Sequence, residues 1–295
     1  MMDFSKSITI ALGGGGAKGN AHIGVLRRLE QAGFVVRAAA GTSFGGLVAV
    51  FYALGNSPDK IEEIFNTFDQ SRLHGHTVGD GPSLLGIEGG KIWLQDNLGD
   101  QTFADLKIPC ALTATDLKSG SEVILTEGPL LDAVLATTAI PGIFPPRRIG
   151  DWELVDGGVL DPVPVAPARS LAPGLPVVAV SLNDPIGMPA QPWNIPIPSF
   201  MPQSLMLRIS RSRVAQAVDV ILRSFDIVSR GAAQYRLEVD RPDIIIRPIV
   251  ADIDTLEQVD VSVVAKRGDE AVDAILPELN NLFAWRNRLR RAVGV

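Results

Sequence analysis

The sequence predicts an α/β fold in which helices flank a central, mostly parallel sheet. Three observations support this prediction. The chain has 295 residues, 46% of them hydrophobic and 20% charged, which is enough apolar material for a large core. Apolar runs of strand length alternate with segments of helical periodicity, the pattern of βαβ units. Two glycine-rich turns, residues 13–16 and 41–46, each follow such a run and precede a helical segment. We expect a single domain over residues 1–295.

Strands are expected where a short apolar run lies between turn-forming residues. They are Ser7–Leu12, Phe34–Ala40, Cys110–Thr115, Glu122–Leu125, Trp152–Val155, Val177–Leu182 and Ile244–Ile246. Helices are expected where apolar residues recur every three to four positions or where capping residues occur. They are residues 18–32, Leu47–Leu54, Asp59–Phe68, Leu130–Thr138, 214–228 and Asp269–Trp285. Gly33 ends the first helix, and Ser57-Pro58 supplies an N-cap and a first-turn proline for the third.

A segment near residues 184–230 differs in composition from the rest. Six prolines between residues 185 and 202 exclude regular structure, yet Trp193, Phe200 and other apolar residues lie between them. The helix that follows would place these apolar residues on one face: Val214, Val218, Ile221, Leu222, Phe225 and Val228. Two interpretations stay open: a lid or interfacial segment that meets lipid, or a segment packed on its own domain or a second subunit. The basic residues 286–291 either contact anionic lipid or are solvated.

Composition also excludes several classes of protein. The formal net charge is −6 and the isoelectric point is about 5.2, whereas nucleic-acid binding needs clustered Lys and Arg, so we expect no nucleic-acid partner. The single cysteine, Cys110, excludes an intrachain disulfide framework and indicates a reducing compartment. No signal peptide and no run of about 18 apolar residues is recognised. We expect a soluble, cytoplasmic chain, for which peripheral contact with a membrane stays open.

The second glycine-rich turn, Gly41-Thr42-Ser43-Phe44-Gly45, has the Gly-x-Ser-x-Gly pattern of a nucleophile elbow. In an elbow the serine lies on a strained turn between strand and helix, and the two glycines let the chain pass close to itself. The hydroxyl then stands clear of the sheet, beside a helix N-terminus that favours negative charge. An ordinary turn can show the same five residues. The strand before the motif and the helix after it favour Ser43 as a nucleophile.

The first turn, Gly13-Gly14-Gly15-Gly16-Ala17-Lys18-Gly19, contains the Gly-x-Gly-x-x-Gly pattern of nucleotide-binding turns. A dinucleotide site needs an acid about 20 residues further on, and none is present there; Arg37 would suit a 2′-phosphate, so this alternative stays open. A P-loop needs Ser or Thr after the lysine, but glycine follows it. The favoured interpretation is a row of backbone N–H groups, with the lysine nearby, that stabilises the oxyanion of an acyl-transfer intermediate.

The base for an activated serine is sought among histidines and carboxylates. The chain has His22, His74 and His76, and none follows residue 76, which excludes the Ser…Asp…His order of α/β-hydrolases. We expect His22 to be a packed or surface residue of a helix and the other two to be solvated in a loop. No two have the spacing of a zinc-binding helix. Asp156, at the end of a short apolar run and before two glycines, remains, although an ordinary turn aspartate gives the same pattern.

Together these motifs resemble the patatin-like phospholipases, in particular their compact bacterial branch. The resemblance rests on five blocks in the family's order, Gly13–Leu26, Gly41–Ala49, Ala114–Leu117, Ala139–Pro146 and Leu154–Val165. It implies a three-layer sandwich and a Ser–Asp dyad, with Ser43 as nucleophile and Asp156 as base. It also implies an oxyanion hole at Gly15 and Gly16, with Gly14, Ala17 and Lys18 alongside, and motif glycines at Gly19, Gly41, Gly45, Gly157 and Gly158.

The resemblance implies hydrolysis of lipid carboxylic esters, of phospholipase, lysophospholipase or esterase type, through an acyl-enzyme and without a metal or other cofactor. The expected partner is a lipid or other acyl ester, and the oligomeric state stays open. The chain departs from the family at Lys18, where arginine is commoner, and at Phe44, where a small residue is usual and a ring narrows the acyl site. Two alternatives are a catalytically silent binding or regulatory protein and a nucleotide-binding oxidoreductase.

Overall fold

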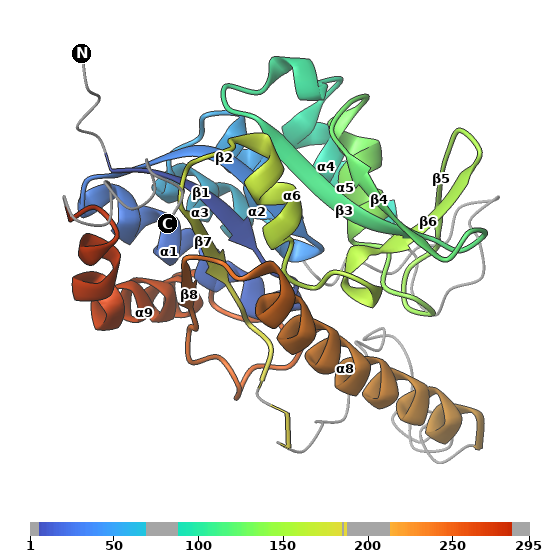
Figure 1. The fold of residues 1–295 in the computed structure, drawn as a ribbon. Helices are drawn as coiled ribbons and strands as arrows, with labels where there is room; N and C mark the ends of the chain where they lie inside the picture. The colour runs from blue at the N-terminus through green and yellow to red at the C-terminus, as the bar shows by residue number, and fades with distance from the viewer. Residues whose placement is uncertain (1–5, 69–87, 185, 188–212, 285–295) are drawn as a thin grey trace.

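The computed structural model describes residues 6–68, 88–184, 186–187 and 213–284, and its centre is a sheet (Figure 1). Its eight described strands are β1 (Lys6–Leu12), β2 (Phe34–Thr42), β3 (Cys110–Asp116), β4 (Ser121–Leu125), β5 (Arg147–Ile149), β6 (Trp152–Asp156), β7 (Val177–Val180) and β8 (Ile244–Ile246). Their order is β5-β6-β3-β2-β1-β7-β8, and β4 pairs with β3. The pairs from β3 to β8 in this order are parallel, and those of β4, β5 and β6 are antiparallel. The predicted mostly parallel sheet is confirmed.

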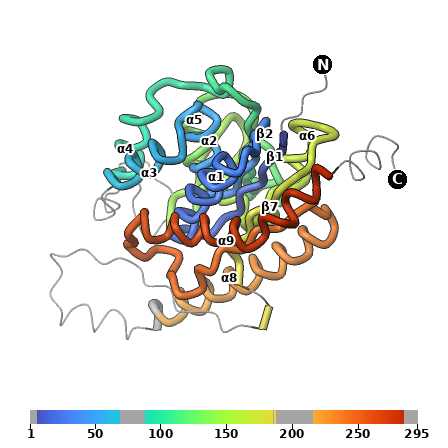
Figure 2. Tube along the Cα trace, turned by 90° about the vertical axis from the view of Figure 1, so that its left-hand side faces the viewer, coloured from blue at the N-terminus to red at the C-terminus, as the bar shows by residue number. Residues whose placement is uncertain are grey.

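Helices cover both faces of this sheet, which confirms the three-layer sandwich (Figures 1 and 2). They are α1 (Ala21–Gln31), α2 (Phe44–Ala53), α3 (Pro58–Asn66), α4 (Glu88–Leu98), α5 (Leu130–Thr137), α6 (Val165–Leu171), α8 (Arg213–Asp240) and α9 (Val261–Asn281). Short 3-10 helices occur at η1 (Gly16–Asn20), η3 (Phe103–Asp105) and η4 (Gly157–Val159). Ser57 caps α3 as predicted, since its side chain accepts a hydrogen bond from the Lys60 N–H.

The side chains of the parallel strands alternate between two buried faces. On one face a row of alanines crosses four strands in register, Ala111, Ala40, Ala11 and Ala179, and α6 packs against it. Small side chains there let a helix approach the sheet closely. On the other face larger residues such as Leu12 form the main core with α1, α2 and α9. Burial on both faces explains why these strands read as continuous apolar runs.

The last helix, α9, packs against α1, and the two backbones approach each other closely where the helices cross (Figure 2). Gly24 of α1 and Gly268 of α9 lie at the crossing. A Cβ on Gly24 would overlap the carbonyl oxygen of Ala265, and a Cβ on Gly268 would overlap that of Ala21. The close contact depends on glycine at both positions.

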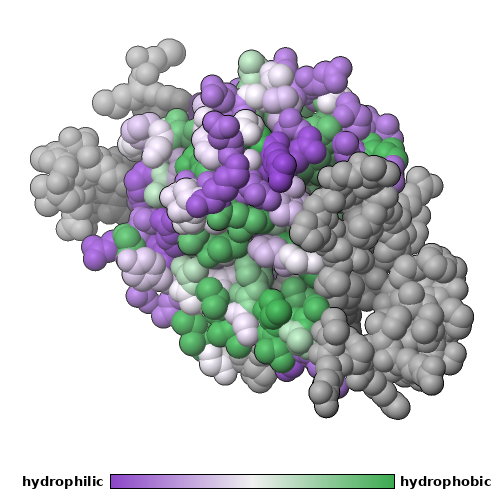
Figure 3. All heavy atoms as spheres, turned by 90° about the vertical axis from the view of Figure 1, so that its right-hand side faces the viewer, coloured by the Kyte–Doolittle hydropathy of each residue, from purple (hydrophilic) through white to green (hydrophobic). Residues whose placement is uncertain are grey.

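Two predicted helices differ from the structure. α9 begins at Val261, capped by the Asp260 side chain, eight residues before the predicted start at Asp269, and it continues through Pro277. α8 extends to Asp240, and its buried face was assigned wrongly at two positions. Ile221 and Val228 are 63% and 60% exposed, because the helix turns Leu222 and Leu237 inward instead. Figure 3 shows hydrophobic surface in the lower part of the molecule, where α8 lies.

Other predictions fall on residues that the structure does not describe. They are the proline-interrupted residues 188–202, His74 and His76, and the basic residues 286–291. Within the described part of the chain, none of the helices combines the length and the apolar character that crossing a membrane requires.

Candidate active site

Ser43 lies between β2 and α2 on a strained backbone. Its φ is 55° and its ψ is −128°, a combination that residues other than glycine rarely adopt. Two glycines make this turn possible, because a Cβ on Gly41 would lie 2.5 Å from the Gly45 carbonyl oxygen and a Cβ on Gly45 would overlap that of Leu12. The Ser43 N–H donates a hydrogen bond of 2.9 Å to the Thr137 hydroxyl. The local geometry is that of a nucleophile elbow.

The register of β3 brings Ser43 and Asp156 together. Thr113 of β3 pairs with Thr42, the last residue of β2, and the next residue, Ala114, pairs with Asp156, the last residue of β6. Because β2 runs parallel to β3 and β6 runs antiparallel to it, the carboxyl ends of β2 and β6 meet at neighbouring positions of one strand. Ser43 directly follows Thr42, so its side chain lies beside that of Asp156.

The Asp156 carboxyl is buried, and the Ser43 side chain lies close enough to it to favour its ionised form. Its Oδ1 also accepts a hydrogen bond of 2.7 Å from the Gly158 N–H. Burial raises the pKa of Asp156 from 3.8 to about 6, and the Ser43 side chain and the Gly158 N–H, which favour the ionised form, offset only part of that rise. Gly157 has no space for a side chain, since a Cβ there would overlap the Thr113 hydroxyl.

The glycine-rich turn after β1 lies directly against the serine. A Cβ on Gly14 would be 3.3 Å from the Ser43 Cβ. The N–H groups on either side of Gly15 and Gly16 already have acceptors, because Gly14 donates to the Pro162 carbonyl and Ala17 donates to the Thr255 carbonyl, each at 2.9 Å. These two bonds hold the ends of the turn in place.

Gly15 and Gly16 lie between those two anchored positions. Among the described residues, no carbonyl or side chain accepts a hydrogen bond from the N–H of either glycine, and both glycines line the same cavity as Ser43. Gly19, the last glycine of the motif, lies against the ring of Phe44, which a Cβ at this position would overlap. Of the predicted oxyanion-hole residues, Gly15 and Gly16 therefore keep free donors beside the serine.

Lys18 and His22 support this turn from outside. The Lys18 Nζ lies 3.3 Å from Asp184 Oδ2, and neither of the two cavities at Ser43 has Lys18 in its wall, so the structure does not direct this charge to the serine. His22 is buried, and burial lowers its pKa to about 4. The neutral ring lies with Nε2 2.7 Å from the Gly13 carbonyl oxygen, to which it donates. His22 is thus a packed residue, as expected.

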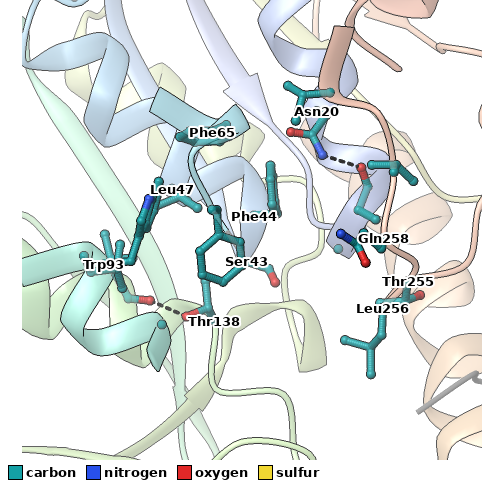
Figure 4. A pocket seen from close by; sticks show the side chains of 18 of the residues that line it. Asn20, Ser43, Phe44, Leu47, Phe65, Trp93, Thr138, Thr255, Leu256 and Gln258 are labelled. Carbon is teal, nitrogen blue, oxygen red and sulfur yellow. Dashed lines mark hydrogen bonds between the residues drawn. The ribbon is translucent and has the colours of Figure 1, made fainter. Parts of the chain in front are cut away.

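Two cavities meet at Ser43. The large cavity has a volume of about 270 Å³, and its wall is formed mainly by Phe44, Leu47, Phe65, Trp93, Leu94 and Val134 (Figure 4). None of the described residues that line it is charged. Figure 4 shows Ser43 between these aromatic rings and the segment that carries Thr255, Leu256 and Gln258. The ring of Phe44 packs edge to face on that of Phe65, with centroids 5.6 Å apart.

The small cavity has a volume of about 60 Å³ and contains the polar groups of the site. Ser43, Asp156 and the glycine-rich turn form one side, and α8 contributes Phe225, Asp226 and Ser229 to the other. Sequence analysis did not assign these three residues to the site. Their only signal was the amphipathic helix itself, which does not reveal where α8 docks. Among the described residues, no cluster of three or more His, Cys, Asp or Glu side chains is placed to hold a metal ion.

The fold and this site define an α/β protein with its polar site at the carboxyl ends of the central strands and a serine on a nucleophile elbow. The chain belongs to the patatin-like phospholipase family: the family model "Patatin-like phospholipase" matches residues 10–169.

The comparisons with individual proteins agree with this family. The chain is 35% identical over 190 residues to uncharacterized NTE family proteins of Mycobacterium bovis and Mycobacterium tuberculosis, covering 63% of this chain and 52% of theirs. It is 29% identical over 169 residues to neuropathy target esterase sws of Drosophila grimshawi, covering 54% of this chain and 11% of the esterase. The chain therefore spans about half, or less, of the length of these relatives. The crystal structure of VipD from Legionella pneumophila shares the fold, with a TM-score of 0.55 and 13% identity, over 94% of this chain and 67% of VipD.

Proposed function

We propose that this chain is a serine acyl hydrolase that cleaves carboxylic esters of lipids, with Ser43 as nucleophile and Asp156 as general base. The observation that carries the proposal is the placement of the Ser43 side chain beside the buried Asp156 carboxyl where β2 and β6 meet. Membership of the patatin-like phospholipase family supports lipid esters as the substrate class. Phospholipids, lysophospholipids and simple acyl esters all share the bond that is cleaved.

In the acylation step, Ser43 Oγ attacks the carbonyl carbon of the ester while Asp156 takes the hydroxyl proton. The oxyanion that forms accepts hydrogen bonds from the N–H groups of Gly15 and Gly16, and each donor of this kind stabilises a transition state by about 3 kcal/mol. The bond between the carbonyl carbon and the alcohol oxygen then breaks, and Asp156 gives its proton to that oxygen. The alcohol leaves, and Ser43 carries the acyl group.

In the deacylation step, a water molecule attacks the same carbonyl carbon and Asp156 takes one of its protons. The bond to Ser43 Oγ breaks, and the proton passes from Asp156 to this oxygen. The products are a carboxylic acid and the regenerated hydroxyl. One ester and one water are consumed, and Asp156 alternates between base and acid in both steps.

The raised pKa of Asp156 suits this role, because a carboxylate with a higher pKa is a stronger base and is still ionised at neutral pH. Protonation removes the base. The rate kcat/KM is therefore expected to fall to half of its plateau near pH 6, whereas an exposed aspartate would keep the enzyme active to about pH 4.

The large cavity is suited to the acyl chain. It opens beside Ser43, and the described residues in its wall are uncharged and largely apolar or aromatic. Burying each methylene of an acyl chain there contributes about 0.8 kcal/mol. The ring of Phe44, which forms part of the wall, limits the width of the space near the serine.

The test is covalent labelling with a fluorophosphonate, followed by mass mapping of the adduct. We expect a single adduct on Ser43, and Ser43→Ala should lose both the adduct and ester hydrolysis. Asp156→Asn should lose turnover while remaining folded, as judged by circular dichroism. Ser170→Ala, on the distant helix α6, is the matched control and should retain both. An adduct at another residue, or full activity of Ser43→Ala, would overturn the assignment; a folded chain without adduct or turnover would favour the catalytically silent alternative.

A further inference from the structure

The two cavities at Ser43 take different halves of the substrate, an assignment that rests on the proposed function. Asp156 has to return a proton to the oxygen of the leaving alcohol. Asp156 lines the small cavity and not the large one, whereas Ser43 lines both. The alcohol therefore occupies the small cavity, and the acyl chain extends into the large one.

The described wall of the small cavity carries negative charge. Its two charged residues are Asp156 and Asp226, and the described residues of the wall include no lysine or arginine. Asp226 lines the cavity, and its side chain is 23% exposed. A substrate group placed here meets the base on one side and a second carboxylate, from α8, on the other.

In the described part of the chain, Asp226 is paired with a cation that does not line the small cavity. Arg230 NH2 lies 2.6 Å from Asp226 Oδ2 and 3.3 Å from Asp184 Oδ2, and Lys18 Nζ lies 3.3 Å from the same Asp184 oxygen. The Arg230 side chain is only 5% exposed. These four residues form an alternating chain of charges that is neutral as a whole and presents its carboxylate end, Asp226, to the cavity. An anionic ligand would approach the negative end of this chain.

We propose that Asp226 is a specificity-determining residue that selects esters of small uncharged alcohols, such as glycerol, and discriminates against esters whose alcohol carries a phosphate. A phosphomonoester carries a charge of about −1.5 to −2 at neutral pH. Holding it beside Asp226 and Asp156 in a small, partly buried space adds like-charge repulsion and removes its hydration. Hydroxyl groups of a polyol instead donate hydrogen bonds to Asp226 and Ser229. The preference for an uncharged alcohol then arises both from repulsion of a phosphate and from hydrogen bonds to the hydroxyl groups.

The test compares two soluble substrates with the same acyl chain, 1-octanoylglycerol and 1-octanoylglycerol 3-phosphate. The parameter to measure is kcat/KM, because it reports the steps through acylation, in which the alcohol leaves; both substrates then give the same octanoyl-enzyme. We expect the wild-type protein to prefer the uncharged ester by at least about tenfold, equivalent to about 1.4 kcal/mol. Asp226→Asn should reduce this ratio by about tenfold.

The chain offers a matched control. Asp219 forms the same i,i+4 ion pair with Arg223, two turns earlier on α8, and neither cavity has Asp219 in its wall. Asp219→Asn should leave the ratio unchanged. A second variant, Ser229→Asp, adds a carboxylate to the small cavity and should increase the ratio, which keeps the proposal testable if Asp226→Asn does not fold.

Each outcome bears on one of the two proposals. Equal use of both esters by the wild-type protein, or equal effects of Asp226→Asn and Asp219→Asn, would overturn the assignment of Asp226 and leave the hydrolase intact. Failure to hydrolyse either ester, together with the absence of a fluorophosphonate adduct on Ser43, would instead overturn the proposed function.

Discussion

Replacing Asp156 by asparagine should stabilise the fold at alkaline pH while it removes the catalytic base. The carboxyl is buried against Ser43 and Gly158, and its pKa in the folded protein is about 6, compared with 3.8 for an ordinary aspartate. A raised pKa means that the folded state holds the proton more tightly than the unfolded state does. Ionising the group therefore costs the folded state more than the unfolded state.

The size and sign of this effect follow from the pKa values. Below about pH 4, Asp156 is protonated in both states and contributes no penalty. As the pH rises towards 6, the unfolded chain releases the proton first and gains stability relative to the folded protein. Above pH 6 the penalty is constant. It is about 3 kcal/mol, because a difference of one pKa unit corresponds to about 1.4 kcal/mol. Asparagine stays neutral and keeps an oxygen that accepts from the Gly158 N–H, so it avoids the penalty.

The assay is urea denaturation of the wild-type protein and Asp156→Asn at pH 4.5, 6 and 8. The variant should gain stability relative to wild type as the pH rises, by up to about 3 kcal/mol at pH 8, with unchanged m-values. Other carboxyl groups titrate in both proteins and cancel in the difference. A stability difference that is the same at all three pH values would show that the ionised carboxyl is not penalised in the fold, and the account of its raised pKa would be wrong.

Three further predictions concern the packing, the large cavity and the surface of α8. In a urea titration, Gly24→Ala should lower the free energy of unfolding by about 3 kcal/mol, because the new Cβ overlaps a backbone oxygen of α9. The control is Gly231→Ala, whose Cβ would meet no described atom within 4 Å and which should not destabilise the protein. Phe44→Ala should shift the preference among p-nitrophenyl esters, measured from butyrate to palmitate, towards bulkier or longer chains, and an unchanged profile would contradict a role for this ring in the acyl site. Ile221→Ser combined with Val228→Ser should reduce hydrolysis of lipid vesicles several-fold and spare a soluble ester, if α8 contacts the lipid surface through its exposed apolar residues; equal loss on both substrates would exclude such contact.

The parallel strands were predictable because most of their residues are apolar and lie in the interior of the sheet. β1, β2 and β8 are rich in apolar residues, and their observed bounds differ from the predicted ones by at most two residues. Helix α8 shows the opposite situation. It carries apolar residues around most of its circumference, so periodicity alone cannot decide that Leu222 is buried while Ile221 is exposed. For α9, the Asp260 cap is a signal that was available in the sequence, but the proline within the helix obscured the pattern.

Some residues of the site could be predicted from the sequence and others could not, for the same physical reason. Ser43, Asp156 and the glycine-rich turn could be proposed from the sequence, because backbone strain and close approach require glycines at fixed spacing beside them. The acceptor for the Ser43 N–H, Thr137, and the Asp226 wall of the small cavity could not, because each contact depends on where a distant helix docks on the sheet. Such contacts are set by tertiary packing and leave no local pattern.

The residues proposed to carry out the reaction and the helix proposed to select the alcohol lie in different parts of the chain. Ser43, Asp156 and the glycine-rich turn all fall within residues 10–169, the stretch that the family model matches, whereas α8 follows it. If Asp226 selects the alcohol as proposed, mutations on α8 alter which ester is preferred and leave Ser43 and Asp156 unchanged. On that assignment, the substrate preference of this chain can be changed through one helix that lies outside the stretch matched by the family model.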